Sequence, residues 1–227
     1  MATNVYVDGP NLYYGALRDR PVRWLDLTTW CERLLPDHDV KRVRYFTAWA
    51  HPSPERQQVD RQQIYLRALQ TSPKISVHLG RCLKDTVVLR EPRTSNQRRV
   101  VKVRLKGVDV ALATQLLADA ATGDCDTVVL VSNDSDFKPT IIAARRALGV
   151  RVGLVNPGRG VGSDKRPLVN FDLEPLASSY AAALFPAEMS DARGPFHAPN
   201  GGSRPTHPGA DDHRRAAKRT RHVAGPF

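Results

Sequence analysis

Three aspartates in the sequence stand where short strand-like runs end. Asp8 closes the run Asn4–Asp8, and Asp134 and Asp136 follow directly after the run Thr127–Ser132. Paired carboxylates repel each other unless a proton or a cation is shared between them. A hard divalent cation prefers oxygen ligands, and Mg²⁺ commonly takes one or two carboxylates together with water and substrate phosphate. The pattern favours a site for Mg²⁺ or Mn²⁺, although each segment alone also fits a helix cap.

A fourth acid, Asp109, lies in the first turn of a helix predicted from Val108 to Ala121. Lys106, just before this helix, carries a positive charge that suits a phosphate group. Two polar residues accompany the acids: Asn11 opens the helix after Asp8, and Ser132 ends the run before Asp134. Each residue also has a purely structural interpretation, as a first-turn acid favoured by the helix dipole or as a turn residue.

The elements that must position these residues alternate between strand and helix. The predicted strands are 4–8, 40–49, 75–83, 127–132 and 150–155, and the predicted helices are 11–18, 27–35, 54–69, 108–121, 141–148 and 174–184. Such alternation predicts an α/β fold with a mostly parallel, doubly wound sheet. Ligands of such sheets bind at the carboxyl ends of the strands, where the acids are predicted to lie.

An inserted segment interrupts this alternation. Two strand-like runs, 86–90 and 100–105, flank a stretch of turn residues and charge, which predicts a basic β-hairpin. We expect it to contact RNA phosphates, and the basic residues nominated for this are Arg98, Arg99, Lys102, Arg104 and Lys106. The same charges also fit the protection of an exposed strand edge. Tyr13, together with Tyr14, fits either stacking on unpaired bases or packing in the core.

Composition narrows the class of partner. The 227 residues carry a formal net charge of +11 with a pI of about 10.0, which favours a polyanion such as nucleic acid. The three cysteines lack the spacing of a zinc site, and no apolar run is long enough to span a membrane, so we expect a cytoplasmic protein. We predict one domain over residues 1–185 and a disordered basic tail rich in Pro, Gly and Ala over 186–227. The oligomeric state stays open, with a homodimer among the options.

Three blocks of the sequence, VYVDGPNLYYG, KGVDVALATQLLADA and VLVSNDSDFKPTI, occur in this order along roughly residues 3–156. Together they resemble the NYN domain family, in its LabA-like branch of PIN-like nucleases. The resemblance implies a Rossmann-like, three-layer fold and a metal-dependent ribonuclease whose acids meet at the carboxyl edge of the sheet. It implicates Asp8, Asp109, Asp134 and Asp136 as metal ligands, Asn11 and Ser132 as polar supports, and Lys106 as the basic residue before the second block.

One position departs from the pattern of that branch. Six residues after Asp109, where the branch typically has another aspartate, this sequence has Gln115. A neutral amide is a weaker ligand for a hard cation than a carboxylate. The prediction is therefore a ribonuclease, a phosphodiester hydrolase, with a catalytically weak or inactive RNA-binding protein as its alternative. A third class, a phosphatase or a phospho-accepting receiver domain, also gathers aspartates at strand ends.

Overall fold

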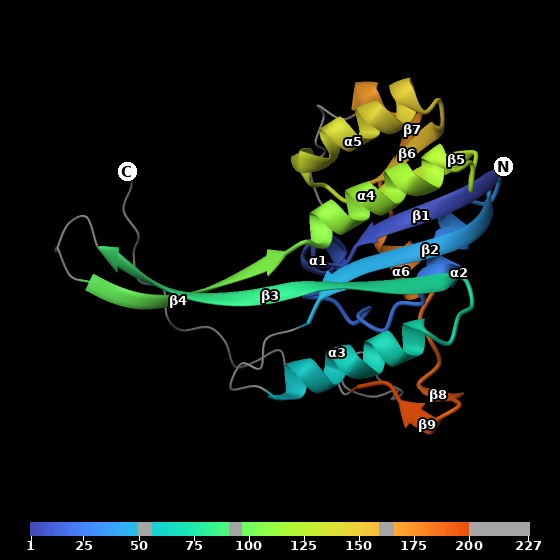
Figure 1. The fold of residues 1–227 in the computed structure, drawn as a ribbon. Coiled ribbons are helices and arrows are strands. Elements are labelled where there is room, and N and C mark those ends of the chain that lie inside the picture. Colours follow the sequence, from blue (N-terminus) through green and yellow to red (C-terminus); the bar gives the residue numbers. More distant parts are fainter. Residues whose placement is uncertain (50–55, 91–96, 159–165, 200–227) are drawn as a thin grey trace, which may run out of the picture.

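The computed structural model describes residues 1–49, 56–90, 97–158 and 166–199. Its centre is a seven-stranded sheet in the order β4-β3-β2-β1-β5-β6-β7, in which every neighbouring pair is parallel except β3 and β4 (Figure 1). The strands are β1 (Ala2–Asp8), β2 (Asp39–Ala48), β3 (Ile75–Arg90), β4 (Gln97–Lys106), β5 (Thr127–Val131), β6 (Arg151–Val155) and β7 (Phe171–Leu173). The predicted α/β fold with a mostly parallel sheet is confirmed.

Helices cover both faces of this sheet, which makes three layers. The helical segments are α1 (Gly9–Leu12), η1 (Tyr13–Leu17), α2 (Leu27–Leu34), α3 (Arg56–Leu69), α4 (Val108–Ala121), η2 (Ser135–Phe137), α5 (Lys138–Ile142), η3 (Ala143–Ala147), η4 (Arg166–Leu168) and α6 (Ala177–Ala181). Successive residues of a strand point to opposite faces, so Val5 and Val7 join one apolar core and Tyr6 joins the other. The first core packs against α1, α2, α3 and α6, and the second against α4 and α5. None of the described helices is both long enough and apolar enough to cross a lipid bilayer.

Several element boundaries differ from the predicted ones. The predicted helix 11–18 is a short α-helical turn followed by a π-helical turn, η1. The predicted helix 174–184 is shorter, and the strand β7 precedes it. Helix α4 and strand β5 lie at the predicted positions. Gly107 and Gly123 flank the helix, and β5 is a continuous run of buried residues.

Strands β3 and β4 form a long two-stranded arm that projects from the domain (Figure 1). Strand β3 pairs with β2 as far as Gly80 and with β4 from Arg81 onward, where Arg81 lies opposite Lys106. The antiparallel pairing agrees with the predicted hairpin, although β3 is one unbroken strand to Arg90. Residues 91–96 and most side chains of β3 beyond Leu83 and of β4 lie outside the described part of the chain, so the basic surface of the arm stays a prediction.

A second hairpin lies beyond the predicted end of the domain. Strands β8 (Glu188–Asp191) and β9 (Gly194–His197) pair antiparallel. Arg67 of α3 donates to both carboxylate oxygens of Asp191, at 2.6 and 2.9 Å, and its guanidinium lies 4.2 Å from the ring centroid of the buried Phe196. This hairpin belongs to the folded part, which differs from the predicted boundary at residue 186, and residues 200–227 lie outside the described residues.

A buried polar network fixes α4 to the sheet. The carboxylate of Asp119 accepts hydrogen bonds from Tyr6 at 2.7 Å, from Gln115 at 2.8 Å, and from two nitrogens of Arg44 at 2.6 and 3.0 Å. The Asp119 side chain is 8% exposed, and a buried charge of this kind needs such donors to offset its lost hydration. The network sets the position of the helix that carries Asp109.

Candidate functional site

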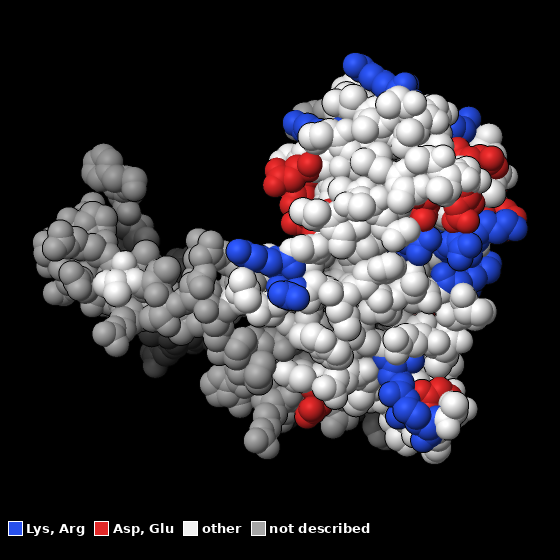
Figure 2. All heavy atoms as spheres, viewed as in Figure 1, with Lys and Arg blue, Asp and Glu red and all other residues white. Residues whose placement is uncertain are grey.

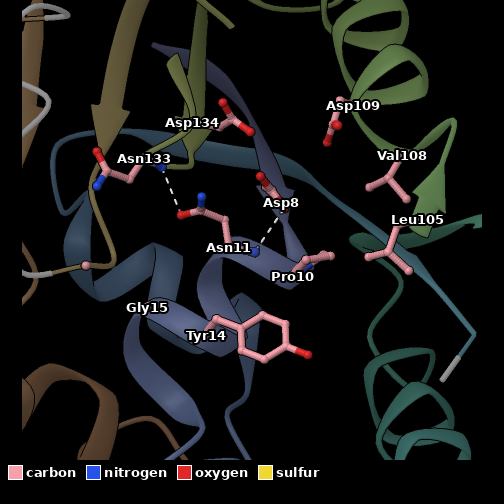
Figure 3. Close-up of a pocket in the computed structure, with 11 residues that line it drawn as sticks. Asp8, Pro10, Asn11, Tyr14, Gly15, Leu105, Val108, Asp109, Asn133 and Asp134 are labelled. Carbon is pink, nitrogen blue, oxygen red and sulfur yellow. Dashed lines mark hydrogen bonds between the residues drawn. The ribbon is translucent and has the colours of Figure 1, made fainter. Parts of the chain in front are cut away.

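Three of the four predicted acids line one cavity at the carboxyl edge of the sheet. Asp8 ends β1, Asp109 lies in the first turn of α4, and Asp134 follows β5. The cavity has a volume of about 450 Å³, and Figure 3 shows the three carboxylates around it. Its other lining residues are Pro10, Asn11, Tyr14, Gly15, Leu105, Val108, Asn133 and Gly158. The topology therefore brings together acids that are up to 126 positions apart in the sequence, as Asp8 and Asp134 are.

Asp8 is held rigidly and lies almost completely out of water, with 4% exposure. One carboxylate oxygen accepts from the backbone N–H of Asn11 at 3.0 Å, so Asp8 also caps α1. The other oxygen accepts from the hydroxyl of Ser132 at 2.9 Å. Burial raises the pKa of Asp8, and the negative charges of Asp109 and Asp134 raise it further, against the effect of the two hydrogen bonds. The predicted metal role and the predicted capping role are compatible at this residue.

Ser132 links the first and third sequence blocks. Its hydroxyl oxygen accepts from the backbone N–H of Asp134 at 3.1 Å while the hydroxyl donates to Asp8. Asp134 in turn accepts from the backbone N–H of Asp136 at 3.0 Å and caps the turn η2. Asp136 is exposed and does not line the cavity, although its charge raises the pKa of Asp109. Asp136 is therefore an outer residue of the acidic group.

The side-chain amide of Asn11 has a defined orientation. Its oxygen accepts from the backbone N–H of Asn133 at 2.9 Å. This bond assigns the oxygen to one side of the amide and turns the amide nitrogen, a donor, toward the carboxylates of the cavity (Figure 3). Asn11 thus links the segments that follow β1 and β5, and its amide N–H groups face the cavity.

Two glycines allow Asp109 to reach the cavity. Gly107 is the N-cap of α4 with φ of +83°, in the left-handed region that glycine tolerates best. A Cβ on Gly80 would lie 2.6 Å from Val108 and 2.9 Å from the carbonyl oxygen of Lys106. The start of α4 therefore packs directly on the β3 backbone. Burial raises the pKa of Asp109, followed by the charges of Asp134 and Asp136.

Tyr14 is the aromatic residue that lines the cavity, whereas Tyr13 packs in the core. Tyr13 is half-buried and packs against the first apolar core, whereas Tyr14 is 64% exposed and lines the cavity. The edge of one ring meets the face of the other at a centroid distance of 5.2 Å, and Arg18 lies 5.5 Å from the Tyr14 ring centroid. Core packing therefore applies to Tyr13, and an exposed ring that could stack on a base belongs to Tyr14.

The remaining predicted residues lie as follows. Lys106 is exposed at the root of the arm, where Figure 2 shows basic side chains below a group of acidic ones. The side chains of Arg98, Arg99, Lys102 and Arg104 lie outside the described residues. Gln115 binds Asp119 and is absent from the described lining of the cavity. The presence of glutamine instead of aspartate at this position therefore affects how α4 packs on the sheet, and it does not change the described lining of the cavity.

The carboxylates are spaced rather than clustered. Within the described part of the chain, no three Asp, Glu, His or Cys side chains lie close enough to hold one ion together. Oxygen donors in this arrangement fit a cation that takes one or two carboxylates and keeps several waters, which is the usual coordination of Mg²⁺. Burial is the main cause of the raised pKa values of Asp8 and Asp109, and the negative charge of Asp134 raises both further.

The mostly parallel sheet and the three layers are of the type found in the PIN-like fold. A model of the NYN domain matches residues 2–166 of the chain, and the chain therefore belongs to the NYN domain family. The matched range contains all four acids and the whole of β3 and β4.

Comparison with curated proteins and with solved structures gives two similar chains. The chain is 33% identical to the 6-hydroxy-3-succinoylpyridine 3-monooxygenase HspA of Pseudomonas putida, over 70% of its own length, and it spans 61% of the length of that relative. A crystal structure of a protein of unknown function from Vibrio parahaemolyticus matches with a TM-score of 0.49 at 18% identity, covering 76% of this chain and 91% of that one.

Proposed function

We propose that this protein is a metal-dependent ribonuclease that hydrolyses phosphodiester bonds of RNA. The observation that carries the proposal is the convergence of Asp8, Asp109 and Asp134 on one cavity from three separate elements. Each acid comes from a different block of the NYN resemblance, and the cavity lies at the edge of the sheet where ligands of open α/β sheets bind.

Asp8 and Asp134 are the residues that would hold Mg²⁺ or Mn²⁺ directly, with Asp109 and Asp136 acting through water. When bound, the metal would polarise the scissile phosphate and lower the pKa of a coordinated water. Ser132 and the Asn11 backbone fix the Asp8 carboxylate in one orientation, which limits the reorganisation needed to bind a cation. Asp109 faces the same cavity with a raised pKa and is suited to accept the proton of the attacking water.

The polar groups around the acids fit a phosphodiester. The Asn11 amide nitrogen donates into the cavity, where a phosphate oxygen suits it. Attack of water on phosphorus then releases the 3′-oxygen. Lys106 at the root of the arm, with Arg98, Arg99, Lys102 and Arg104 farther along β4, supplies charge for neighbouring phosphates. Tyr14 offers an exposed ring on which an unpaired base can stack, which favours single-stranded RNA.

Three narrower assignments follow from this proposal. The chain is placed in the LabA-like branch of the family on the strength of its three sequence blocks. RNA is its macromolecular partner, in keeping with the net charge of +11. The cytoplasm, where RNA is abundant, is its proposed location. The alternative, an RNA-binding protein of the same fold without cleavage, is suggested by Gln115. This support is weaker because Gln115 hydrogen-bonds to Asp119 and does not line the described cavity.

A second candidate function comes from the relative HspA, whose name describes a monooxygenase of a hydroxypyridine. Monooxygenation inserts one oxygen atom of O₂ and needs two electrons from a reductant. The lining of three aspartates disfavours a substrate that carries a carboxylate unless a cation intervenes. This function predicts consumption of O₂ and of a two-electron reductant with a succinoylpyridine, and no cleavage of RNA.

The deciding experiment incubates purified protein with a mixed-sequence single-stranded RNA in Mn²⁺, Mg²⁺ or EDTA. Asp134→Asn is the test variant. Asp37→Asn is its matched control, because Asp37 is exposed and precedes β2 at the opposite edge of the sheet. We expect metal-dependent cleavage by the wild type and the control, and its loss in Asp134→Asn. Intact RNA with all three proteins, in every metal, would reject the ribonuclease proposal, and retention on a native gel would then favour the binding protein.

A further inference from the structure

A second cavity lies apart from the acids, between α3 and β3, and has a volume of about 530 Å³. Pockets of this size that combine an apolar wall with a few polar groups are typical of small-ligand sites. Its lining residues are Trp49, Gln63, Ile64, Leu66, Arg67, Gln70, Val77, Leu79 and Arg193. It shares no residue with the acid-lined cavity, so it needs a separate explanation.

The two walls of this cavity differ in character. Gln63 and Arg67 lie four residues apart on one face of α3, and Gln70 follows directly after the end of that helix. Val77 and Leu79 alternate along β3 and so share the face of the strand that looks toward α3. One wall therefore offers amide and guanidinium groups, and the other offers a flat apolar surface.

An exposed tryptophan stands at one end of the cavity. Trp49 is 44% exposed, whereas Trp24 and Trp30 are 1% and 0% exposed. Leu79, beside it in the lining, is 45% exposed. Large apolar side chains left together in water mark a binding surface more often than chance exposure does. An indole ring next to hydrogen-bonding amides is suited to a planar heterocycle.

Positive charge closes the cavity on the side of the β8–β9 hairpin. Arg67 and Arg193 both pair with the single carboxylate of Asp191, so one positive charge is left over. Arg67 is held by Asp191 and by the carbonyl oxygen of Gly194, but the Arg193 side chain is 66% exposed. Figure 2 shows basic side chains around an acidic one at the bottom of the molecule, where β8 and β9 lie in Figure 1. An anionic group on the ligand would match this surplus.

We propose that this second cavity binds one nucleotide of a single-stranded nucleic acid. Trp49 stacks on the base, Gln63 and Gln70 offer donors and acceptors to its edge, and Arg193 contacts the phosphate. The assignment to the substrate strand rests on the proposed ribonuclease function. Trp49 lies three residues beyond Phe46, the register partner of Asp8, so both cavities open near the same edge of the sheet. A strand cut at the acids therefore has a second anchoring point nearby.

The test uses Trp49 as its own probe, in EDTA, so that cleavage plays no part. Because Trp24 and Trp30 are buried, iodide should quench mainly Trp49, and bound nucleotide should quench its emission and shield it from iodide. The ligands are 5′-AMP, adenosine and a short oligo(A). We expect binding of oligo(A) and 5′-AMP, with weaker binding of adenosine. Arg193→Ala and Gln70→Leu keep the probe and should each weaken binding about fivefold to tenfold, whereas Lys41→Ala, far along the surface on β2, should not.

Trp49→Phe removes the probe and most of the stacking surface, so a dye-labelled oligo(A) is followed by anisotropy instead. We expect its affinity to fall about tenfold, as for other base–aromatic contacts. Unchanged affinity in Trp49→Phe and in Gln70→Leu, with normal circular dichroism, would overturn the inference. Quenching by nicotinate without quenching by 5′-AMP would overturn the nucleotide assignment. Binding at this cavity is measured in EDTA, and cleavage is measured in the separate assay with Mn²⁺ or Mg²⁺. Nucleotide binding in the first assay without cleavage in the second would reject the ribonuclease proposal and leave the nucleotide site standing.

Discussion

The hydroxyl of Ser132 donates a hydrogen bond of 2.9 Å to Asp8, and the same oxygen accepts one of 3.1 Å from the backbone of Asp134. One small side chain thus sets the relative position of the two acids that we assign to the metal. We predict that Ser132→Ala lowers cleavage about 10-fold to 100-fold, the usual effect of losing a partner that orients a metal ligand. Initial rates as a function of Mn²⁺ concentration provide the measurement.

The matched control for this variant is Ser179→Ala on α6, remote from the cavity, which should leave the rate unchanged. Ser132→Ala should raise the Mn²⁺ concentration needed for half-maximal rate rather than only the maximal rate. An effect confined to protein stability, with normal activity in the folded fraction, would contradict the role of Ser132 in positioning.

Replacing Asp8 by Asn separates stability from activity. Burial and two neighbouring acids raise the pKa of Asp8, so its ionised form destabilises the metal-free protein at neutral pH. We predict that Asp8→Asn is inactive yet melts at the same or a higher temperature than the wild type in EDTA. Differential scanning fluorimetry tests this, and it should also show that Mn²⁺ stabilises the wild type but not the variant. A lower melting temperature for the variant in EDTA would count against the assigned charge state.

The pH dependence of metal binding follows from the same shifts. For a carboxyl group whose pKa is raised in the fold, the protonated form is favoured, and its contribution to stability is present below the unfolded pKa of about 3.9 and lost as pH rises through the folded pKa. Metal needs the ionised form. We therefore expect Mn²⁺ affinity and the cleavage rate to rise with pH through a range above that of ordinary carboxyl groups, because the pKa values of Asp8 and Asp109 are both raised.

This expectation is measured by isothermal titration of Mn²⁺ into the protein between pH 4 and pH 8, with the rate followed in parallel. Asp109→Asn should shift the affinity profile to lower pH, since it removes one negative charge that faces Asp8. A midpoint at or below the ordinary aspartate range in the wild type would show that the acids do not share one electrostatic environment.

Two arginines on the same face of β2, two residues apart, provide a matched test of the fold. Arg44 pairs with the buried Asp119, and its side chain is 14% exposed, whereas Arg42 pairs with Asp124 and is 53% exposed. We predict that Arg44→Ala costs about 3–5 kcal/mol, since a buried charge loses its partner. Arg42→Ala should cost about 0–1 kcal/mol. Urea unfolding followed by circular dichroism measures both, and equal effects would contradict the burial of the Asp119 network.

The salt dependence of RNA binding tests the root of the arm. Lys106 is exposed beside the acid-lined cavity and opposite Arg81 in the β3–β4 pair. We predict that Lys106→Ala weakens binding to RNA of any sequence and lowers the slope of log K against log salt by about 1. Lys41→Ala, which removes a charge paired with Asp39, is the control. An unchanged slope in Lys106→Ala would place the RNA elsewhere on the surface.

Strong local patterns allowed the core of this fold to be predicted. The predicted strand 127–132 is the buried central strand β5, Thr127–Val131, and Asp8 ends β1 while Asp134 follows β5, as expected. What could not be predicted depends on contacts between distant segments. Tyr13 and Tyr14 are chemically identical, and only the packing of η1 buries one and exposes the other.

The C-terminal hairpin shows the same limit. Its sequence is rich in residues typical of a tail, and it is held by Arg67, more than a hundred positions earlier in the chain. Likewise, Gln115 reads as a lost ligand in the sequence because it stands in place of an acid. The geometry of α4 instead directs its amide to Asp119. The contact of Arg67 with Asp191 spans 124 positions and leaves no local signal, whereas Gln115 and Asp119 are four residues apart, so helical spacing could have suggested their contact.

The arm has a mechanical consequence. Strand β4 ends at Lys106, α4 begins at Val108, and Asp109 follows at once, so only Gly107 separates the arm from the helix that carries a cavity acid. At this junction the backbone of Gly80 packs so closely on Lys106 and Val108 that a Cβ atom would not fit. The root of the arm and the first turn of α4 are therefore one continuous, closely packed piece of backbone, so a substitution at the root of the arm is expected to change the position of Asp109 as well.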